Sequence, residues 1–410
     1  MKHAQTICSV LLALTLLLLT GCRQSEGKQT TLRIEELPVP CREGGMPNLV
    51  LSAGGKAYLS WVEFIDDTTD ALMFSVLEES GWSEEKEIAR GTNWFVNWAD
   101  FPSLLAFSKD EKLLLAHWLQ KSDQGTYDYD IRVSLSANGG QSWSQSKILN
   151  DDGIAAEHGF VSFCALSDGT AQALWLDGRQ TKEKNGAMSL RTTAILPQGE
   201  IKPSILLDER TCDCCQTDLV KTSNGLLAAY RDRSESEIRD IALLSRENGK
   251  WTKPYTPHPD NWHIAGCPVN GPALAAKKDQ IALLWFTGSE DTARVYLSFS
   301  QDGGKTFGPR FRIDEGQALG RVDVELTETG TACTTWLEKT EGGAEIRFKE
   351  VSPEGKVLLN QRLVTTSPSR DSGFPVLLHS GKNTFLLAYT ALEDNGKSRV
   401  RCLKLSLPKG

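Results

Sequence analysis

The sequence predicts an all-β protein in which a four-stranded sheet repeats around a ring, the architecture called a β-propeller. Three observations predict it. Short apolar strands are separated by turns rich in Gly, Asp and Asn, helical periodicity is absent, and an apolar strand that ends in an aromatic residue recurs at a regular interval. Together they indicate repeated sheets rather than helical layers.

The chain begins with a targeting segment. An apolar run over residues 10–19 leads into Leu19-Thr20-Gly21-Cys22. The run is short for a membrane span, and small residues before a cysteine are typical of a lipobox. We therefore expect residues 1–21 to be a lipoprotein signal peptide, Cys22 to be lipidated, residues 22–30 to form a tether and residues 31–410 to fold as one domain. An ordinary signal peptide or a single anchor helix would also place this domain outside the cytoplasm. Arg23 favours the outer membrane, because aspartate there is the usual retention signal.

The repeat occurs seven times. Successive aromatic residues stand 51 to 57 residues apart, close to the length of a blade with generous loops. They are Trp61, Trp118, Trp175, Tyr230, Trp285, Trp336 and Tyr389. We expect seven four-stranded blades, with six as the alternative. The last copy shows three strands, whereas residues 31–37 stand unpaired before the first copy. That early strand is expected to complete the last blade and so close the ring, which removes exposed sheet edges.

Composition excludes some partners. The formal net charge is -8 and the pI is near 5.5, and no Lys/Arg stripe is present. A surface without a positive field does not attract nucleic acid, so we expect no nucleic-acid partner. We also expect a monomeric protein whose only membrane contact is the lipid anchor.

Two turns carry a family resemblance. Residues 136–143 (SANGGQSW) and 300–307 (SQDGGKTF) place an Asn or Asp before two glycines and an aromatic residue, which suits a hairpin whose side chain accepts backbone N–H groups. Residues 245–251 resemble a degenerate third copy, and Gly81-Trp82 a remnant of a fourth. These turns resemble the Asp boxes of sialidase-like (BNR repeat) propellers. The whole mature chain resembles a group of exported bacterial propellers of this kind that carry a Cys-x-Cys-Cys stretch.

The resemblance implies where a site would lie. Asp-box turns join the third and fourth strands on the face opposite the usual site, so the segments leading into each first strand and the loops after each second strand converge on the channel mouth. Sialidases use three arginines, an acidic aspartate and a tyrosine nucleophile. The matching candidates here are catalytic Asp100, Asp177 and Tyr230, and ligand-binding Arg179, Arg231, Arg233, Arg321 and Arg370. If the protein is an enzyme, this implies an exo-sialidase-like glycoside hydrolase.

Two features limit that implication. The family's Arg-Ile-Pro motif ahead of the first blade is replaced by residues 41–47 (CREGGMP). The arginines and aspartates also have a structural alternative, which is to pair with each other across neighbouring blades. Three tryptophans near the same mouth, Trp94, Trp98 and Trp262, are candidates for stacking on sugar rings, or else they plug loops onto the propeller.

The cysteines offer a second hypothesis. Cys212, Cys214 and Cys215 lie in one segment, Cys267 leads into the next blade, and Cys41 leads into the first. With His158 and His263, these thiols would suit a soft metal such as Cu(I), or Zn²⁺. The alternatives are disulfides, such as Cys267 with Cys214 or Cys215 and Cys41 with Cys212, or free redox-active thiols. Cys164, Cys333 and Cys402 are expected in the core.

Three functions follow from the sequence. The first is binding, with possible hydrolysis, of a glycan or other anionic ligand at the mouth. The second is a metal-binding or redox role centred on the cysteines. The third is a protein-interaction scaffold, since propellers present many loops.

Overall fold

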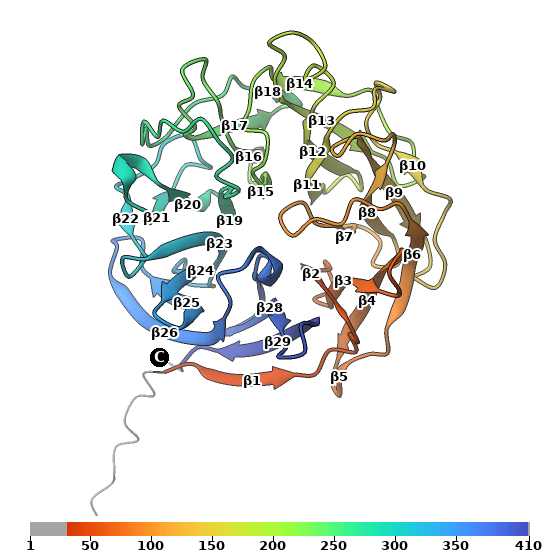
Figure 1. Ribbon diagram of the computed structural model, residues 1–410. Coiled ribbons are helices and arrows are strands. Elements are labelled where there is room, and N and C mark those ends of the chain that lie inside the picture. Colours follow the sequence, from red (N-terminus) through yellow and green to blue (C-terminus); the bar gives the residue numbers. More distant parts are fainter. Residues whose placement is uncertain (1–30, 409–410) are drawn as a thin grey trace, which may run out of the picture.

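Seven sheets surround a central axis in the computed structural model, which describes residues 31–408 (Figure 1). The first three blades are formed by β2 (Gly44–Leu51), β3 (Ala57–Phe64), β4 (Thr69–Glu78), β5 (Gly81–Trp82) and β6 (Lys86–Thr92); by β7 (Ser103–Ala106), β8 (Leu114–Lys121), β9 (Tyr129–Ser136) and β10 (Lys147–Ile148); and by β11 (His158–Ala165), β12 (Ala171–Asp177), β13 (Ser189–Ile195) and β14 (Ile205–Asp208). In the first sheet, β5 and β6 both pair with β4.

The remaining blades repeat this pattern. They are formed by β15 (Asp218–Thr222), β16 (Gly225–Arg231), β17 (Ile241–Glu247) and β18 (Lys250–Trp251); by β19 (Ala273–Lys277), β20 (Gln280–Thr287), β21 (Arg294–Ser300) and β22 (Phe311–Arg312); by β23 (Ala318–Leu326), β24 (Ala332–Thr340), β25 (Gly343–Val351) and β26 (Val357–Thr366); and by β27 (Val376–Gly381), β28 (Thr384–Leu392), β29 (Ser398–Ser406) and β1 (Arg33–Leu37). Within the described residues, the only helices are two 3-10 turns, η1 (Ser289–Asp291) and η2 (Arg370–Ser372).

The ring closes as the sequence predicts. The amino-terminal strand β1 pairs antiparallel with β29, from Arg33 opposite Ser406 to Leu37 opposite Cys402, so the seventh blade joins both ends of the chain (Figure 1). The prediction of seven blades is confirmed, and the six-blade alternative is wrong. Residues 1–30, which carry the predicted signal peptide, Cys22 and tether, lie outside the described residues. In the part that is described, no helix is long and apolar enough to cross a membrane.

The core lies between the blades. Buried hydrophobic side chains form seven clusters among residues 31–408, each shared by the facing sheets of two neighbouring blades. The repeated aromatic residue of each second strand is buried in one of these clusters, with at most 6% of its surface exposed. Since apolar burial drives folding, the 51- to 57-residue spacing of these aromatics reports the blade period itself.

An acidic residue stands two positions after the repeated tryptophan in three of the second strands, and the indole group explains it. In three blades the Trp Nε1–H donates to an acidic side chain two residues later, on the same face of the strand. The pairs are Trp61 with Glu63 at 2.7 Å, Trp175 with Asp177 at 2.9 Å and Trp336 with Glu338 at 2.6 Å. A buried indole N–H needs such an acceptor, so these carboxylates belong to the blade framework.

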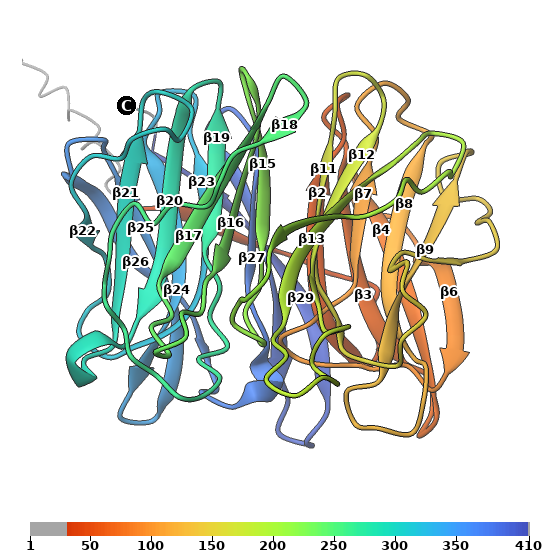
Figure 2. The same ribbon diagram turned by 90° about the horizontal axis from the view of Figure 1, so that it is seen from above.

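The Asp-box turns lie between the third and fourth strands, as predicted. In the second copy, Asp302 Oδ1 accepts the N–H groups of Lys305 and Thr306, both at 2.9 Å. Gly304 has φ of 87°, and a Cβ there would meet Leu227 of the preceding blade at 2.5 Å. Glycine is required because the turn needs positive φ and because the backbone touches the neighbouring blade. In Figure 2 the strands run between the two faces of the ring, which keeps these turns away from the opposite loops.

Candidate functional site

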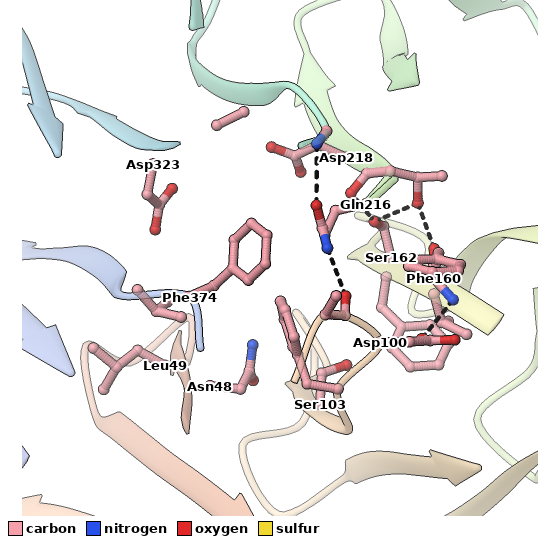
Figure 3. Close-up of a pocket in the computed structure, with 18 of the residues that line it drawn as sticks. Asn48, Leu49, Asp100, Ser103, Phe160, Ser162, Gln216, Asp218, Asp323 and Phe374 are labelled. Atoms are coloured by element: carbon pink, nitrogen blue, oxygen red, sulfur yellow. Dashed lines mark hydrogen bonds between the residues drawn. The ribbon is translucent and has the colours of Figure 1, made fainter. Parts of the chain in front are cut away.

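A cavity of about 290 Å³ occupies the channel, lined mainly by the innermost strands and the segments that lead into them. Its polar wall includes Asp100, Asp218 and Asp323, together with Asn48 and Gln216 (Figure 3). Acidic side chains at the centre of a ring of sheets are the most distinctive feature of this cavity.

Most of these polar groups connect one blade to the next. Asp218 Oδ2 accepts the N–H of Leu274 at 2.7 Å, and Asp323 Oδ2 accepts that of Leu377 at 2.6 Å. Burial raises the pKa of Asp218 to about 6 and that of Asp323 to about 7, because charging a carboxyl in this enclosed space costs free energy. These two aspartates therefore fasten neighbouring first strands around the channel.

Asp100 belongs to a different arrangement, in which one phenol joins two carboxyl groups. Tyr129 Oη lies 3.1 Å from Asp100 Oδ2 and 3.1 Å from Glu157 Oε1, so the two carboxylate oxygens are at most about 6 Å apart. Burial raises the pKa of Asp100 to about 7 and the pKa of Glu157 to about 8, with the nearby Asp100 charge as a further cause for Glu157. Both groups therefore keep protons close to neutral pH, which suits general-acid chemistry.

Asp100 also has a framework role. Its Oδ1 accepts the N–H of Phe160 at 2.7 Å, and Phe160 has positive φ. In the fifth blade Asn270 does the same for Arg321, whose N–H it accepts at 2.7 Å and whose φ is also positive. Asp100 and Asn270 each stand two residues before a proline that opens the first strand. In these two blades the position supplies an acceptor oxygen to the next blade, and of the two residues only Asp100 is an acid.

Asp177 and Arg179, predicted as acid and carboxylate ligand, form an internal ionic network. Arg179 Nε lies 2.7 Å from Asp177 Oδ1, and its Nη2 lies 2.9 Å from Asp151 Oδ1. His158 Nε2 lies 3.0 Å from Asp152 Oδ2. Burial lowers the pKa of His158, but Asp152 and Asp177 raise it above its ordinary value overall. The structural alternative of paired charges applies here.

His158 was predicted as a metal ligand beside the cysteines, but the structure groups it with the carboxylates of Asp152 and Asp177 and not with the cysteine sulfurs. Its Nδ1 lies 3.1 Å from the carbonyl oxygens of both Tyr129 and Ala156, while Nε2 faces Asp152. Both ring nitrogens are thus engaged with oxygen atoms, and the buried ring has no cysteine among its hydrogen-bond partners.

Tyr230, the predicted nucleophile, is the repeated aromatic of the fourth blade. It is fully buried, and its hydroxyl donates to Asp208. Burial raises the pKa of this phenol, with the charges of Asp208 and Asp232 adding to the effect. A buried phenol that is harder to ionise than usual is poorly suited to act as a nucleophile.

Two predicted arginines are turned into the protein. Arg231 is 1% exposed and donates to the carbonyl oxygens of Asn270, Arg239 and Phe286. Arg321 is 6% exposed, and its guanidinium donates to Ser372 Oγ and to nearby carbonyls, including that of Gly373 at 3.0 Å. Burial lowers the pKa of Arg321 to about 10. Neither side chain is free to bind the carboxylate of a ligand.

Of the other two predicted arginines described next, one is paired with carboxylates and one is unpaired. Arg233 forms ion pairs with Asp213 at 3.1 Å and Glu237 at 2.7 Å. Arg370 is exposed, and its side chain makes no hydrogen bond within the described residues; its guanidinium carbon lies 5.9 Å from the centre of the Trp98 ring. The five arginines do not converge on one point, so no free carboxylate-binding cluster is formed.

The three tryptophans have separate environments. Trp94 stacks on Trp118 of its own blade with ring centres 5.5 Å apart, and Trp262 is buried 5.0 Å from the Arg231 guanidinium. Trp98 is half-buried and crosses from the second blade to the seventh, where it stacks on Phe374 at 5.7 Å. Of the three, Trp98 is the one whose ring lies beside an exposed, unpaired cation near the cavity.

Four of the predicted cysteines are brought together on the segments leading into β15 and β19. Cys212 Sγ lies 3.6 Å from Cys215 Sγ and 3.9 Å from Cys214 Sγ. A side-chain hydrogen bond with Cys214 lowers the pKa of the exposed Cys267 to about 7. His263 is exposed on the loop that leads to Cys267, and its backbone pairs with Ile238.

Cys41 does not join this group, so the predicted pairing with Cys212 is wrong. It is buried between the first and seventh blades, where its sulfur accepts the N–H of Val400 at 3.4 Å, and burial raises its pKa to about 12. Cys164, Cys333 and Cys402 are buried, as predicted.

Three residues that the sequence did not indicate complete the site. Tyr129 and Glu157 form the acid arrangement with Asp100, and Gln216 spans the mouth. Gln216 Nε2 donates to Ala99 O of the second blade at 2.6 Å, and its Oε1 accepts the N–H of Gly271 in the fifth at 3.0 Å (Figure 3). The sequence could have indicated Glu157 and Gln216 only as direct neighbours of the predicted site residues His158 and Cys215.

Comparison with known proteins agrees with this architecture. A family model described as a BNR repeat-like domain matches residues 67–352. One solved structure of similar fold is a protein of unknown function from Dyadobacter fermentans DSM 18053, with 13% sequence identity, a TM-score of 0.53 and coverage of 92% of this chain and 99% of that chain. A second is the polysaccharide lyase Uly1, with 10% identity, a TM-score of 0.52 and coverage of 90% of each chain. A third is the α-L-arabinofuranosidase Arb93A from Fusarium graminearum with an iminosugar inhibitor, with 13% identity, a TM-score of 0.51 and coverage of 93% of this chain and 99% of that chain. No curated protein matches the chain. The seven-bladed protein described here belongs to the BNR repeat-like domain family.

Proposed function

We propose that this protein binds a neutral glycan at the mouth of its channel. The observation that carries the proposal is the Asp100–Tyr129–Glu157 arrangement, of which Asp100 lines the cavity of about 290 Å³. The half-buried Trp98, which stacks on the cavity-lining Phe374, supplies an apolar ring face of the kind that sugars stack on. Two solved structures of similar fold carry the printed names of a polysaccharide lyase and an arabinofuranosidase, which supports a carbohydrate ligand.

The charges at the mouth favour a neutral ligand over a sialoside. Arg231 and Arg321 are committed to internal acceptors, and the cavity wall carries carboxyl groups. A ligand carboxylate there would find neither Arg231 nor Arg321 to hold it, and Arg370 alone does not form the arginine cluster that a sialoside requires. This proposal narrows the glycan or anionic ligand expected from the sequence.

The Asp100–Tyr129–Glu157 arrangement also supports acid-catalysed hydrolysis of the bound glycan. We propose that Glu157 donates a proton to the glycosidic oxygen as its bond to the anomeric carbon breaks, while a water molecule attacks that carbon and releases a proton to solvent. Tyr129 and Asp100 act as positioning residues. The separation of the two carboxylate oxygens is at most about 6 Å, an upper limit that includes the separation of about 5–5.5 Å found in retaining glycosidases and excludes the wider inverting spacing. Because the pKa of Glu157 is raised to about 8, the proton is available at neutral pH, and activity is expected to fall as pH rises through 8.

The test uses the full-length chain against a panel of neutral arabinosides and other glycosides, with sialosides as the contrast. Trp98→Ala is expected to weaken glycan binding by roughly tenfold, as loss of one aromatic contact does. Trp94→Ala, the matched control within the second blade, is expected to leave binding unchanged. Glu157→Gln is expected to slow hydrolysis by about 10²- to 10⁴-fold with little change in binding. Preferential binding of sialosides, or a Trp98→Ala chain that binds as the wild type does, would contradict the proposal.

We also propose that the protein is anchored in the cell envelope through a lipid on Cys22. The apolar run and the Leu-Thr-Gly-Cys sequence support this. Labelling of cells with a radioactive fatty acid should mark the wild-type chain and leave Cys22→Ser unlabelled. A labelled Cys22→Ser chain would refute the assignment.

A further inference from the structure

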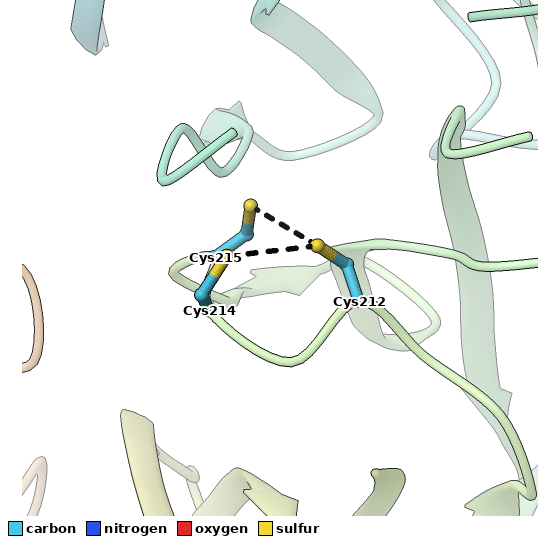
Figure 4. Close-up of side chains that lie close together, drawn as sticks. All are labelled: Cys212, Cys214 and Cys215. Carbon is cyan, nitrogen blue, oxygen red and sulfur yellow. Dashed lines mark hydrogen bonds between the residues drawn. The ribbon is translucent and has the colours of Figure 1, made fainter. Parts of the chain in front are cut away.

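A compact group of thiols lies beside the mouth, outside the acid arrangement used above. Cys212, Cys214 and Cys215 belong to the segment between β14 and β15, and their three sulfur atoms all lie within 4.8 Å of one another (Figure 4). The two shorter separations, 3.6 Å and 3.9 Å, bracket the sulfur–sulfur edge of roughly 3.8 Å that a tetrahedral site with metal–sulfur bonds of about 2.3 Å requires. The thiols already have the spacing of metal ligands.

Two buried arginines lie near Cys212. Arg239, 3% exposed, points Nη1 at Cys212 Sγ from 3.1 Å, and the Cys212 N–H donates to the carbonyl of the buried Arg231. Arg231 forms no ion pair with a carboxylate among the described residues; its guanidinium contacts carbonyl oxygens and the Trp262 ring. A buried cation without a carboxylate needs an anion nearby, and thiolates held by a metal would provide it.

Cys267 offers a fourth donor from the next blade. It is exposed and lies near Cys214, but its sulfur is outside the group of three that lie within 4.8 Å of one another, so its side chain must move inward to ligate. The set therefore combines two buried sulfurs, of Cys212 and Cys215, with the partly exposed Cys214 and the exposed Cys267, so that an ion can enter without unfolding of the blade.

We infer that Cys212, Cys214 and Cys215, with Cys267 as fourth ligand, bind a thiophilic metal ion of the Zn²⁺ or Cu⁺ class. Sulfur-only coordination selects these ions over Mg²⁺ and Ca²⁺, which prefer oxygen. Binding replaces the proton of each thiol that ligates, releases those protons to solvent and changes no oxidation state.

The site would also control the mouth. Cys215 directly precedes Gln216, whose amide links the second blade to the fifth, and Cys267 lies four residues before Gly271, which that amide binds. An ion held between the two segments would fix Gln216 across the cavity. This consequence is independent of the proposed glycan, because it concerns the order of the mouth and not the ligand.

The experiment begins with the full-length chain purified in detergent without chelator. Elemental analysis is expected to find about one equivalent of zinc or copper, and X-ray absorption at that metal's edge is expected to show only sulfur neighbours at about 2.3 Å. Stripped protein is then titrated under reducing conditions with Zn²⁺ alone and with Cu⁺ alone, and the tighter ion identifies the natural one. The absorption spectrum needs no variant, so it tests the inference even if a cysteine substitution prevents folding.

Variants separate this site from the other thiols. Cys267→Ser, at an exposed position, is expected to weaken metal binding by roughly tenfold or more, and Arg239→Gln by about 10- to 100-fold through loss of its hydrogen bond to Cys212. Cys164→Ala, a buried thiol of the third blade, is the matched control and should bind metal as the wild type does. A chain that binds neither ion after reduction, or whose purified form holds these four cysteines in two disulfides, would overturn the inference. Neither result would bear on glycan binding.

Discussion

Asp100→Asn tests whether the raised pKa of this carboxyl is real while leaving the framework intact. The substitution should fold, because Asn270 fills the equivalent position of the fifth blade with an amide. In the variant, the amide oxygen can accept the Phe160 N–H, and the amide nitrogen can donate to Tyr129 Oη, which still donates to Glu157. The change thus removes one titrating group and no hydrogen bond.

The magnitude follows from linkage. Burial raises the pKa of Asp100 from 3.8 to about 7, so above about pH 4 the folded state keeps a proton that the unfolded state releases. Stability therefore falls as pH rises from about 4 to about 7, by about 1.4 kcal/mol per pH unit for this group. Asp100 is 2% exposed, so solvent screening does not reduce this figure. Between pH 5 and pH 8 the wild-type chain should lose about 3 kcal/mol more than Asp100→Asn.

The assay is urea unfolding followed by tryptophan fluorescence at several pH values from 5 to 8. Asp323→Asn is the contrast, because both oxygens of Asp323 accept backbone N–H groups, from Val324 and Leu377. An amide nitrogen there would face an N–H donor, so this variant should lose stability at every pH. If the wild type and Asp100→Asn give parallel stability profiles, the buried carboxyl does not titrate near neutrality and Asp100 cannot support the acid role of Glu157.

Three further substitutions test the framework, each measured by the free energy of unfolding. Gly304→Ala should cost about 2–5 kcal/mol, because it combines positive φ with a clash against the preceding blade. Gly303→Ala, with φ of 76° and a nearest neighbour at an ordinary contact distance of 3.5 Å, should cost only the backbone share of about 1–2 kcal/mol. Equal losses would exclude the clash. Arg321→Met should lower the free energy of unfolding by about 2–5 kcal/mol, because it leaves buried carbonyl oxygens without a donor. Arg370→Met should leave stability nearly unchanged. If Arg370→Met lowered stability more than Arg321→Met, the buried guanidinium would not be needed. Leu32→Ala should lower the free energy of unfolding by about 2–5 kcal/mol, because this side chain is only 5% exposed and packs in the cluster between the sixth and seventh blades. An unchanged stability would mean that the amino-terminal segment does not stabilise the seventh blade.

The sequence by itself determined the architecture of this protein. Each blade repeats the same local solution, an aromatic residue on the second strand and a turn with fixed backbone needs, so spacing alone revealed seven copies. The unpaired segment before Trp61 predicted ring closure, because an open sheet edge is unfavourable. Asp302 and Gly304 were readable as a turn because their chemistry is local.

The tertiary structure decided which polar residues are available for function. Asp177 and Arg231 have the same residue types as catalytic groups, but one is the acceptor of a buried indole and the other is surrounded by carbonyl oxygens. Glu157 became a candidate acid only through its contact with Tyr129, from the neighbouring blade. Burial and hydrogen-bond partners arise where blades meet, from residues far apart in the chain, and a pattern of residue types along one strand does not contain that information.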